Sequence, residues 1–388
     1  MQIKKYISKL LNILILLIII FKNKYVEKNL FIKVNYNDKI RIYQLNDIFN
    51  LSINKKTILI FEGNNFHSEC SPGFSKYFID LGFNVDIIMN NYGKDSFDLF
   101  EDKDKIRLIT YKYFNQINSL IEKLKSLMEN YSYIVIQTTI PHIIKTISKL
   151  NLLINKKVIY VFHLTNVYNS LHFSQIENKN RIWTLGHFPI GIYVNPHYFG
   201  KIKLKKKNKI TRFFTISSIY RKYNYLVSTS QKLKEENYDF EIIVIGKTKT
   251  FSKKNINGKL KNNFIFNYNV NFSQLYKAVD SSDYILITLD PDNKRDKIFK
   301  YNKVTGSAQL SYGFLKPVII NYYFSNAYNM TKENCFLFDK TNFYEVMKKA
   351  IVLNNQDYKI MQKNLINLSN RLYHDSLLNV KKTLLSLK

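Results

Sequence analysis

Short apolar runs alternate with amphipathic segments along the first half of the chain. Strands are predicted by the short, mainly apolar runs at 57–61, 85–89, 106–109, 133–137 and 158–162. Helices are predicted by the segments at 73–81, 117–129 and 142–152, the last two with apolar residues spaced near 3.6. This alternation predicts a parallel sheet covered by helices on both faces.

The second half repeats the pattern after a connection. A proline-containing turn at 194–200 and the lysine-rich run IKLKKKNK form the predicted linker. Further strands are predicted at 212–216, 241–245, 284–288 and 317–320, and further helices at 223–236, 271–279, 343–353, 358–372 and 377–387. The chain therefore reads as two α/β domains, at 56–196 and 210–372.

The amino-terminal residues carry a separate signal. The run LLNILILLIIIF at 10–21 is apolar and has lysines on both sides, but it is shorter than the about 20 residues that span a bilayer. It lacks the small-residue cleavage site of a signal peptide. An interfacial helix, a short signal anchor and a helix docked on the domain all remain open. The flanking lysines favour a membrane-associating helix over residues 1–30.

The formal net charge of +30 raises the question of a nucleic-acid partner. Only seven of the 59 basic residues are arginine, and no arginine-rich or aromatic–glycine RNA motif is present. We therefore expect an anionic membrane surface or a phosphorylated acceptor as partner, and no nucleic acid. Cys70 and Cys335 are read as free thiols of a reducing compartment, and no clustered Cys/His spacing suggests a metal.

Two segments have the character of anion sites. In YNKVTGSAQLSYGFLKPVII, at 301–320, Gly306 and Ser307 open a predicted helix, whose unpaired N–H groups suit a phosphate. Lys303 and Thr305 precede that start, and Thr305 is equally consistent with a helix N-cap. The second candidate phosphate site, at 221–222, follows the apolar run 211–216 and is the pair Arg221 and Lys222. A solvated basic pair is the alternative there. Together the sites predict a bound nucleoside diphosphate.

These segments resemble the donor site of GT-B glycosyltransferases. The resemblance is carried by TGSAQLSYGFLKPVII and by TRFFTISSIYRKYNYLVSTSQKLKEENYDFEIIVIG, and it weakens over 56–196. It implies two Rossmann-like domains facing across a cleft, the second binding a nucleotide sugar, and a helix at 373–388 that crosses back to the first. It also implies close approach of the nucleotide to Gly246, and a ribose contact for Gln309, where the family uses glutamate. Two family glutamates, expected near 301–302 and 309–310, are missing, so retention and inversion both stay open.

The acceptor side is predicted in the first domain. The long polar loop EGNNFHSECSPG, at 62–73, offers His67 and Glu69 as acid–base or acceptor-binding groups. A hydrogen bond within the loop and a solvated carboxylate are the alternatives. The resemblance implies that His163, after the strand at 158–162, lies near the transferred sugar, although a strand cap fits as well. The stretch DPDNKRD, at 290–296, is interpreted as a mobile solvated loop.

The sequence therefore predicts a glycosyltransferase that moves a sugar from a nucleotide-sugar donor to a glycan or lipid-linked acceptor. We expect it to act in cell-surface polysaccharide synthesis at the cytoplasmic face of the membrane, without cofactor or metal. A catalytically degraded GT-B scaffold that binds a nucleotide or glycan as a partner subunit is the alternative. A basic nucleic-acid-binding protein is the third reading.

Overall fold

The computed structural model describes residues 40–64, 66–149, 155–165, 176, 178–217, 223–246, 251, 256 and 258–387. The apolar run at 10–21, on which the expected membrane-associating helix rests, lies outside these ranges. Within them, no helix is both long enough and apolar enough to cross a bilayer.

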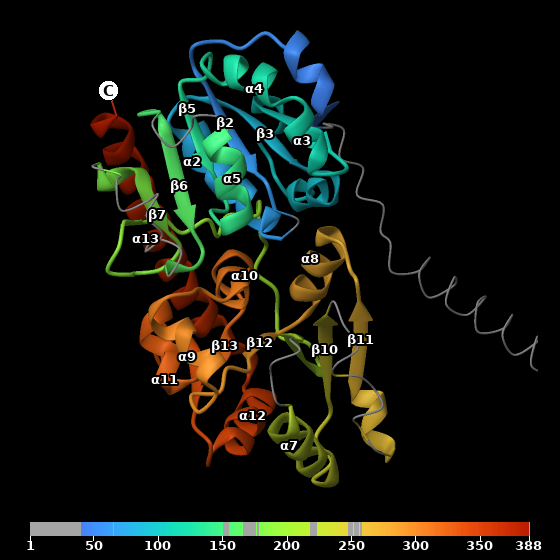
Figure 1. The fold of residues 1–388 in the computed structure, drawn as a ribbon. Coiled ribbons are helices and arrows are strands. Elements are labelled where there is room, and N and C mark those ends of the chain that lie inside the picture. Colours follow the sequence, from blue (N-terminus) through green and yellow to red (C-terminus); the bar gives the residue numbers. More distant parts are fainter. Residues whose placement is uncertain are drawn as a thin grey trace, which may run out of the picture. The chain divides into compact units, whose positions relative to one another are not determined.

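The first half forms a sheet in which neighbouring strands are parallel (Figure 1). Among the described residues its strands lie in the order β1, β4, β3, β2, β5, β6, β7, β8. The strands are β1 (Arg41–Gln44), β2 (Thr57–Glu62), β3 (Asn84–Asn90), β4 (Ile106–Tyr111), β5 (Tyr133–Ile136), β6 (Val158–Phe162), β7 (Ile182–Thr184) and β8 (Ile192–Tyr193). The helices are α2 (Ser71–Asp80), α3 (Asn115–Ser119), α4 (Ile121–Met128) and α5 (Pro141–Lys149). Strands β2, β5 and β6 are buried along their whole length, as continuous apolar runs require.

The second half forms another parallel sheet, ordered β11, β10, β9, β12, β13, β14 in the part of the chain that is described. Its strands are β9 (Thr211–Ile216), β10 (Phe240–Gly246), β11 (Phe264–Tyr268), β12 (Tyr284–Ile287), β13 (Val318–Asn321) and β14 (Cys335–Phe338). The helices are α7 (Asn224–Glu235), α8 (Phe272–Ser281), α9 (Lys294–Tyr301), α10 (Gly306–Phe314), α11 (Tyr322–Ser325), α12 (Phe343–Val352) and α13 (Asn355–Ser386). Two Rossmann-like α/β halves were predicted, and both are present.

The interpretation of 290–296 as a solvated loop is wrong for its last three residues, which begin a helix. Helix α9 begins at Lys294, capped by the side chain of Asn293, which accepts from the backbone N–H of Arg295. Asp296 is buried, and its Oδ2 accepts a hydrogen bond of 2.9 Å from the backbone N–H of Asp290. The charged residues of this stretch suggested exposure to water. The carboxylate of Asp296 instead accepts a hydrogen bond from the backbone, and a helix begins there.

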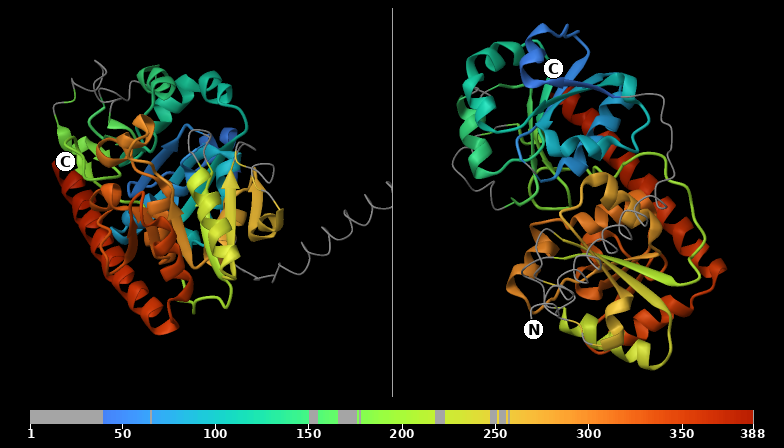
Figure 2. Two further views of the ribbon diagram at one scale, coloured as in Figure 1. Left: turned by 90° about the horizontal axis from the view of Figure 1, so that it is seen from below. Right: turned by 90° about the vertical axis from the view of Figure 1, so that its right-hand side faces the viewer.

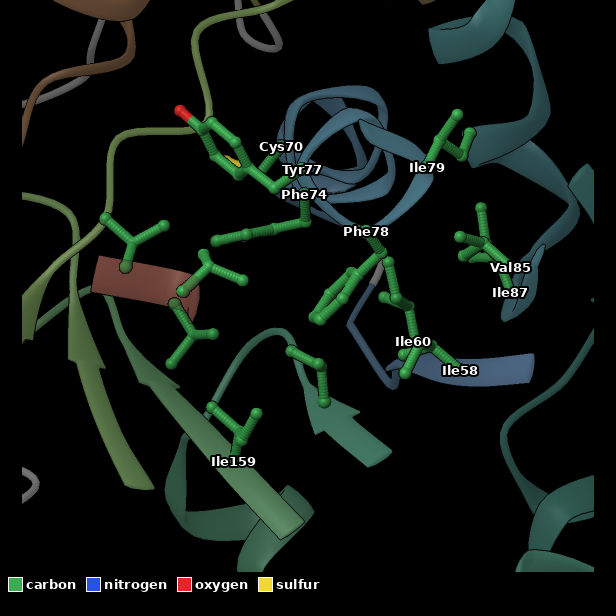
Figure 3. Packing of buried hydrophobic residues seen from close by; sticks show 14 of the residues in the cluster. Ile58, Ile60, Cys70, Phe74, Tyr77, Phe78, Ile79, Val85, Ile87 and Ile159 are labelled. Atoms are coloured by element: carbon green, nitrogen blue, oxygen red, sulfur yellow. The ribbon is translucent and has the colours of Figure 1, made fainter. Parts of the chain in front are cut away.

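The core of the first half is built on α2. Phe74, Tyr77 and Phe78 of that helix belong to the same buried cluster as Ile60 of β2 (Figure 3). The ring of Trp183, from β7, stacks on Phe74 and Phe78 with centroids 6.0 and 6.1 Å away. Aromatic side chains bury the largest areas, so this cluster contributes much of the stability of the first half.

Helix α13 contributes to the cores of both halves and is one unbroken helix of 32 residues (Figure 2). Leu365, Leu368 and Leu372 lie in the core of the second sheet. Val380 and Leu384 lie in the core of the first. The predicted helices at 358–372 and 377–387 are thus parts of one element.

The connection between the halves passes two glycines. A Cβ atom on Gly73 of α2 would overlap the backbone of Pro196, and one on Gly313 of α10 would overlap the carbonyl oxygen of His197. Only glycine permits backbone approaches this close. The segment at 194–200 is therefore held by one helix of each half.

Candidate active site

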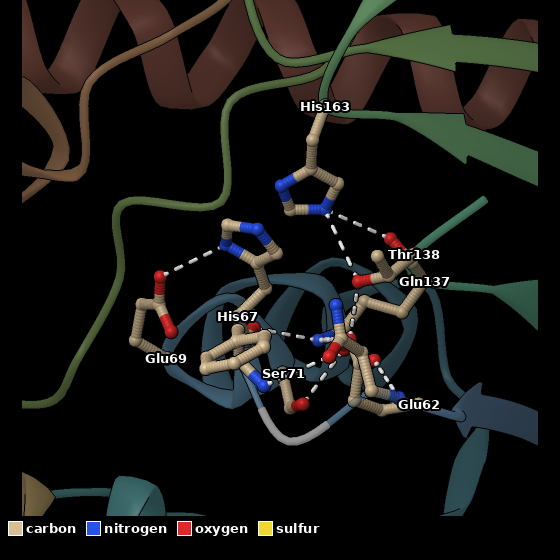
Figure 4. Close-up of polar contacts among 9 residues, drawn as sticks. Glu62, His67, Glu69, Ser71, Gln137, Thr138 and His163 are labelled. Atoms are coloured by element: carbon tan, nitrogen blue, oxygen red, sulfur yellow. Dashed lines mark hydrogen bonds and ion pairs between the residues drawn. The ribbon is translucent and has the colours of Figure 1, made fainter. Parts of the chain in front are cut away.

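Polar side chains follow three neighbouring strands of the first sheet, where each strand ends (Figure 4). Glu62 is the last residue of β2. Gln137 and Thr138 come directly after β5, and His163 comes directly after β6. Because β2, β5 and β6 are adjacent and parallel, their carboxyl ends lie at one edge of the sheet. The side chains meet at that edge.

Glu62 is fully buried, and both of its carboxylate oxygens accept hydrogen bonds. Oε1 accepts from the backbone N–H of Asn64 at 2.7 Å. Oε2 accepts from Nε2 of Gln137 at 2.7 Å and from Oγ1 of Thr138 at 2.6 Å. Burial raises the pKa of Glu62 to about 7, against the opposing effect of the Thr138 hydrogen bond. Carboxyl groups that titrate near neutrality are concentrated in functional sites.

Gln137 connects Glu62 to both histidines of the site. Its Nε2 also donates to the carbonyl oxygen of His67 at 2.8 Å, and its own carbonyl oxygen lies 3.0 Å from Nε2 of His163. Its Oε1 accepts from Oγ of Ser71 at 2.7 Å. His67 has a φ of 75°, a left-handed conformation that a non-glycine residue adopts only when its surroundings impose it. The hydrogen bond from Gln137 is one such constraint.

The two histidine rings lie against each other. Their centroids are 4.1 Å apart and their planes are inclined by 33°. Nδ1 of His67 lies 3.4 Å from Oε1 of Glu69. His67 is partly exposed, whereas His163 is buried. The structure thus brings together His67, Glu69 and His163, the three residues that the sequence predicted as catalytic.

The two rings have opposite electrostatic surroundings. Burial lowers the pKa of His67, but the hydrogen bond and charge of Glu69, with the charge of Glu62, raise it above its ordinary value. Burial and the charge of His67 hold the pKa of His163 well below its ordinary value. His163 is therefore neutral, and its contact with the carbonyl oxygen of Gln137 assigns the proton to Nε2. This leaves Nδ1 of His163 as an acceptor.

The sequence did not single out Glu62, Gln137 or Thr138. The available signal was the polar residue that ends each apolar run, since the carboxyl ends of adjacent parallel strands converge. Without the strand order, nothing in the sequence shows which strand ends are neighbours.

The predicted phosphate loop lies at the start of α10. Gly306 is the first residue of the helix and Thr305 is its N-cap, but the Thr305 side chain makes no capping hydrogen bond. A Cβ atom on Gly306 would meet no heavy atom of the described residues within 4 Å, so these residues leave open space at the helix start. The first-turn N–H groups of a helix are available to an anion at such a place.

Two buried side chains in this first turn have unused hydrogen-bonding capacity. Ser307 is 1% exposed and Gln309 is 3% exposed. Neither Oγ of Ser307 nor the amide oxygen and nitrogen of Gln309 has a partner within the described part of the chain. Buried polar atoms without partners are costly, which is consistent with a polar ligand at this place.

The loop after β6 connects the histidine site to the start of α10. Leu164 pairs with Lys303 in an antiparallel bridge. The backbone N–H of Thr165 donates to the carbonyl oxygen of Asn302 at 3.1 Å, and its Oγ1 donates to Oδ1 of Asn302 at 2.9 Å. The positive charge of Lys303 also disfavours the protonated form of both rings: it opposes the raised pKa of His67 and adds to the lowered pKa of His163. The two predicted sites therefore adjoin each other.

The remaining predicted donor residues have different outcomes. Gly246 is the last residue of β10, at the carboxyl end of its strand. Arg221 and Lys222 lie outside the described residues. Across the ranges that are described, no group of three or more His, Cys, Asp or Glu side chains is arranged to hold a metal ion.

No protein-family model and no curated protein sequence matches the chain. Solved structures do resemble it. A glycosyltransferase from Rickettsia africae ESF-5 matches with a TM-score of 0.53 at 14% identity, over 86% of this chain and 99% of that one. HepE from Anabaena, solved in complex with UDP and glucose, matches with a TM-score of 0.47 at 13% identity, over 85% of this chain and 100% of its own.

At 14% identity, the likeness to the Rickettsia structure establishes the fold and no more. The chain has the GT-B fold of glycosyltransferases. The resemblance to GT-B glycosyltransferases that was predicted from the segments at 211–246 and 301–320 is confirmed for the fold.

Proposed function

We propose that the protein transfers a sugar from a nucleotide-sugar donor to a glycan or lipid-linked acceptor in cell-surface polysaccharide synthesis. The observation that supports this most is the pairing of Leu164 with Lys303. It joins the loop that carries His163 to the segment that leads into α10. A site for a reacting hydroxyl thus adjoins a site for a phosphate, within a GT-B fold.

His67 is the proposed proton acceptor. Its Nδ1 faces Glu69, so its Nε2 is the nitrogen that takes the proton of the acceptor hydroxyl. The acceptor oxygen then forms the new bond to the anomeric carbon, while the bond from that carbon to the diphosphate oxygen breaks. His163 offers its unprotonated Nδ1 as a hydrogen-bond acceptor to a sugar hydroxyl beside His67.

The departing diphosphate is assigned to the start of α10. The backbone N–H groups at Gly306 and Ser307 receive the developing negative charge, without a requirement for a metal ion. Arg221 and Lys222 complete this site in the proposal. Gln309 bonds a ribose hydroxyl, since its buried amide has no partner among the described residues, and Gly246 allows the nucleotide to approach β10.

The alternative function is a GT-B scaffold that binds a nucleotide or glycan as a partner subunit. The absence of glutamate at 301–302 and 309–310 favours it. Nucleotide-sugar turnover separates the two: both bind nucleotide, but only the enzyme consumes the donor.

A thermal-shift screen of UDP, GDP, CMP and their sugar derivatives tests the donor site, because a ligand that binds the folded state raises its stability. At least one should stabilise the protein. His67→Ala should then slow turnover of that donor by about a hundredfold or more without changing nucleotide binding. His187→Ala is the matched control, since His187 is exposed and stacks on Tyr193. Absence of any stabilisation contradicts the proposal.

A further inference from the structure

The large apolar side chains that are exposed among the described residues are of two kinds, aromatic and aliphatic, and the two kinds lie at different places in the fold. Of the aromatic ones, Phe66, Tyr92 and Tyr113 lie in the segments that follow β2, β3 and β4, whereas Tyr301 is the last residue of α9 and Tyr322 is the first residue of α11. The aliphatic ones lie on strands, on helices or in the connection between the halves: Ile42, Leu204, Ile210, Ile265, Val352, Ile360, Leu378 and Leu385. Among the described residues of the first half, the exposed aromatic rings are thus confined to the segments that follow β2, β3 and β4.

Three of these rings belong to consecutive strands beside the histidine site. Phe66, Tyr92 and Tyr113 follow β2, β3 and β4, which are neighbours in the sheet. Their exposed fractions are 50%, 75% and 59%. Adjacent strands are about 4.8 Å apart, so the three loops cover roughly 10 Å along the sheet edge. Phe66 directly precedes His67, so the row begins at the proposed base.

Each aromatic residue is fixed through its backbone. The N–H of Phe66 donates to Oδ1 of Asn64 at 3.3 Å, and the N–H of Tyr92 donates to Oδ1 of Asn90 at 3.0 Å. The N–H of Tyr113 donates to Oε1 of Gln116 at 2.9 Å.

The second and third loops are also tied to each other. Nδ2 of Asn90 donates to the carbonyl oxygen of Lys112 at 3.2 Å. Loops held in this way lose little backbone freedom when a ligand covers the rings that they carry.

The chemistry of this row fits a carbohydrate better than a lipid chain. A pyranose ring has a face of C–H groups, which carry partial positive charge, and the face of an aromatic ring is negative. Its hydroxyl rim remains in water beside the exposed side chain of Lys112, whose Nζ lies 5.1 Å from the centroid of the Tyr113 ring. An acyl or prenyl chain would instead favour a continuous aliphatic surface, and the exposed aliphatic side chains described lie elsewhere.

We propose that Phe66, Tyr92 and Tyr113 form acceptor subsites on which successive sugar rings of a glycan chain stack, with the chain end at His67. This inference rests on the proposed function and specifies its acceptor as an oligosaccharide rather than a single sugar or a lipid tail. Binding then strengthens with glycan length up to the number of rings that the row accommodates.

The test measures binding of malto-, cello- and chito-oligosaccharides, from mono- to tetrasaccharide, to the full-length protein saturated with UDP. In at least one series the trisaccharide should bind about fivefold or more tightly than the monosaccharide. Tyr92→Leu and Tyr113→Leu should each remove most of this gain, because leucine keeps the apolar character and loses the ring. Tyr92→Phe and Tyr113→Phe should keep it.

Three outcomes overturn the inference. The first is glycan binding that does not depend on glycan length. The second is glycan binding by the leucine variants that equals that of the phenylalanine variants. The third is a leucine variant whose main defect is loss of binding to phosphatidylglycerol–phosphatidylethanolamine vesicles. Stabilisation by UDP without length-dependent glycan binding contradicts the acceptor subsites alone. Failure of UDP and every other nucleotide to stabilise the protein contradicts the proposed function itself.

Discussion

The imidazole rings of His67 and His163 lie 4.1 Å apart between centroids, although they come from different loops of the first sheet. Glu69 favours the charged form of the first ring, while burial and the neighbouring charge keep the second neutral. Because the pKa values of the two rings are shifted in opposite directions, His67 can serve as the proton acceptor while His163 serves as a neutral hydrogen-bonding partner.

Glu69→Gln should shift the pH dependence of sugar transfer. His67 acts as a base only when neutral, so the rate of the wild type should rise with pH through a pKa above the ordinary 6.5. Removing the Glu69 charge lowers that pKa, and the rising limb should move to lower pH. The measurement is kcat/KM against pH, and an unmoved limb would show that Glu69 does not act on the titrating group.

Glu62 should make folding stability depend on pH. The unfolded chain releases this proton near 4.5, whereas the folded protein releases it near 7. Between these values the folded state binds more protons, so the contribution of Glu62 to the unfolding free energy falls as pH rises. The total loss is about 3 kcal/mol.

Denaturant titrations of wild type and Glu62→Gln, followed by the fluorescence of buried Trp183, measure this effect. The stability of the variant relative to wild type should increase with pH across this window. Parallel stability curves would mean that the carboxyl has an ordinary pKa in the folded state.

Changes at the start of α10 should weaken nucleoside-diphosphate binding. Gly306→Val places a branched side chain in the open space before the helix, where oxygens would meet N–H groups. Arg221→Ala removes a charge-assisted hydrogen bond in the proposal. Each should raise the Kd for the diphosphate roughly tenfold or more, measured by calorimetry. Lys297→Ala, on the exposed side of α9, is the control, and equal effects of all three would argue against a phosphate site.

Two glycines of α10 should respond in opposite ways to the same substitution. Gly313→Ala forces a Cβ atom into Phe199 and the carbonyl oxygen of His197, and should destabilise the protein by about 1–3 kcal/mol. The new Cβ atom of Gly306→Ala meets no described atom within 4 Å, so this substitution should be neutral or slightly stabilising. Denaturant midpoints compare the pair directly. Similar losses at both positions would show that the close contact at Gly313 does not decide the effect.

Removing residues 1–24 tests the proposed membrane association. The truncated protein should move from the membrane fraction to the supernatant and keep its denaturant midpoint, since the described core begins at Ile40. Aggregation or a lowered midpoint would instead identify the run at 10–21 as a helix docked on the domain.

The alternation of strands and helices could be predicted because strands such as β2 and β6 are continuous apolar runs with little ambiguity. The strands β7 and β8 could not be predicted, because they contain too few residues to show a pattern. The helix start at Lys294 could not be predicted either, because charged residues form its first turn. Glu62 was missed for a different reason. Its partner Gln137 is 75 residues away, and a buried carboxylate in a sequence looks like any solvated one until its partners are known.

Helix α13 also determines when the first half can finish folding on the ribosome. Nε1 of Trp183 donates at 2.9 Å to Oγ1 of Thr383, which is synthesised 200 residues later. Until that segment emerges, the place of Val380 and Leu384 in the core around Trp183 stays empty and apolar surface remains open to water. The nascent first half is therefore expected to wait as an incompletely packed intermediate, dependent on chaperones for longer than its own length requires.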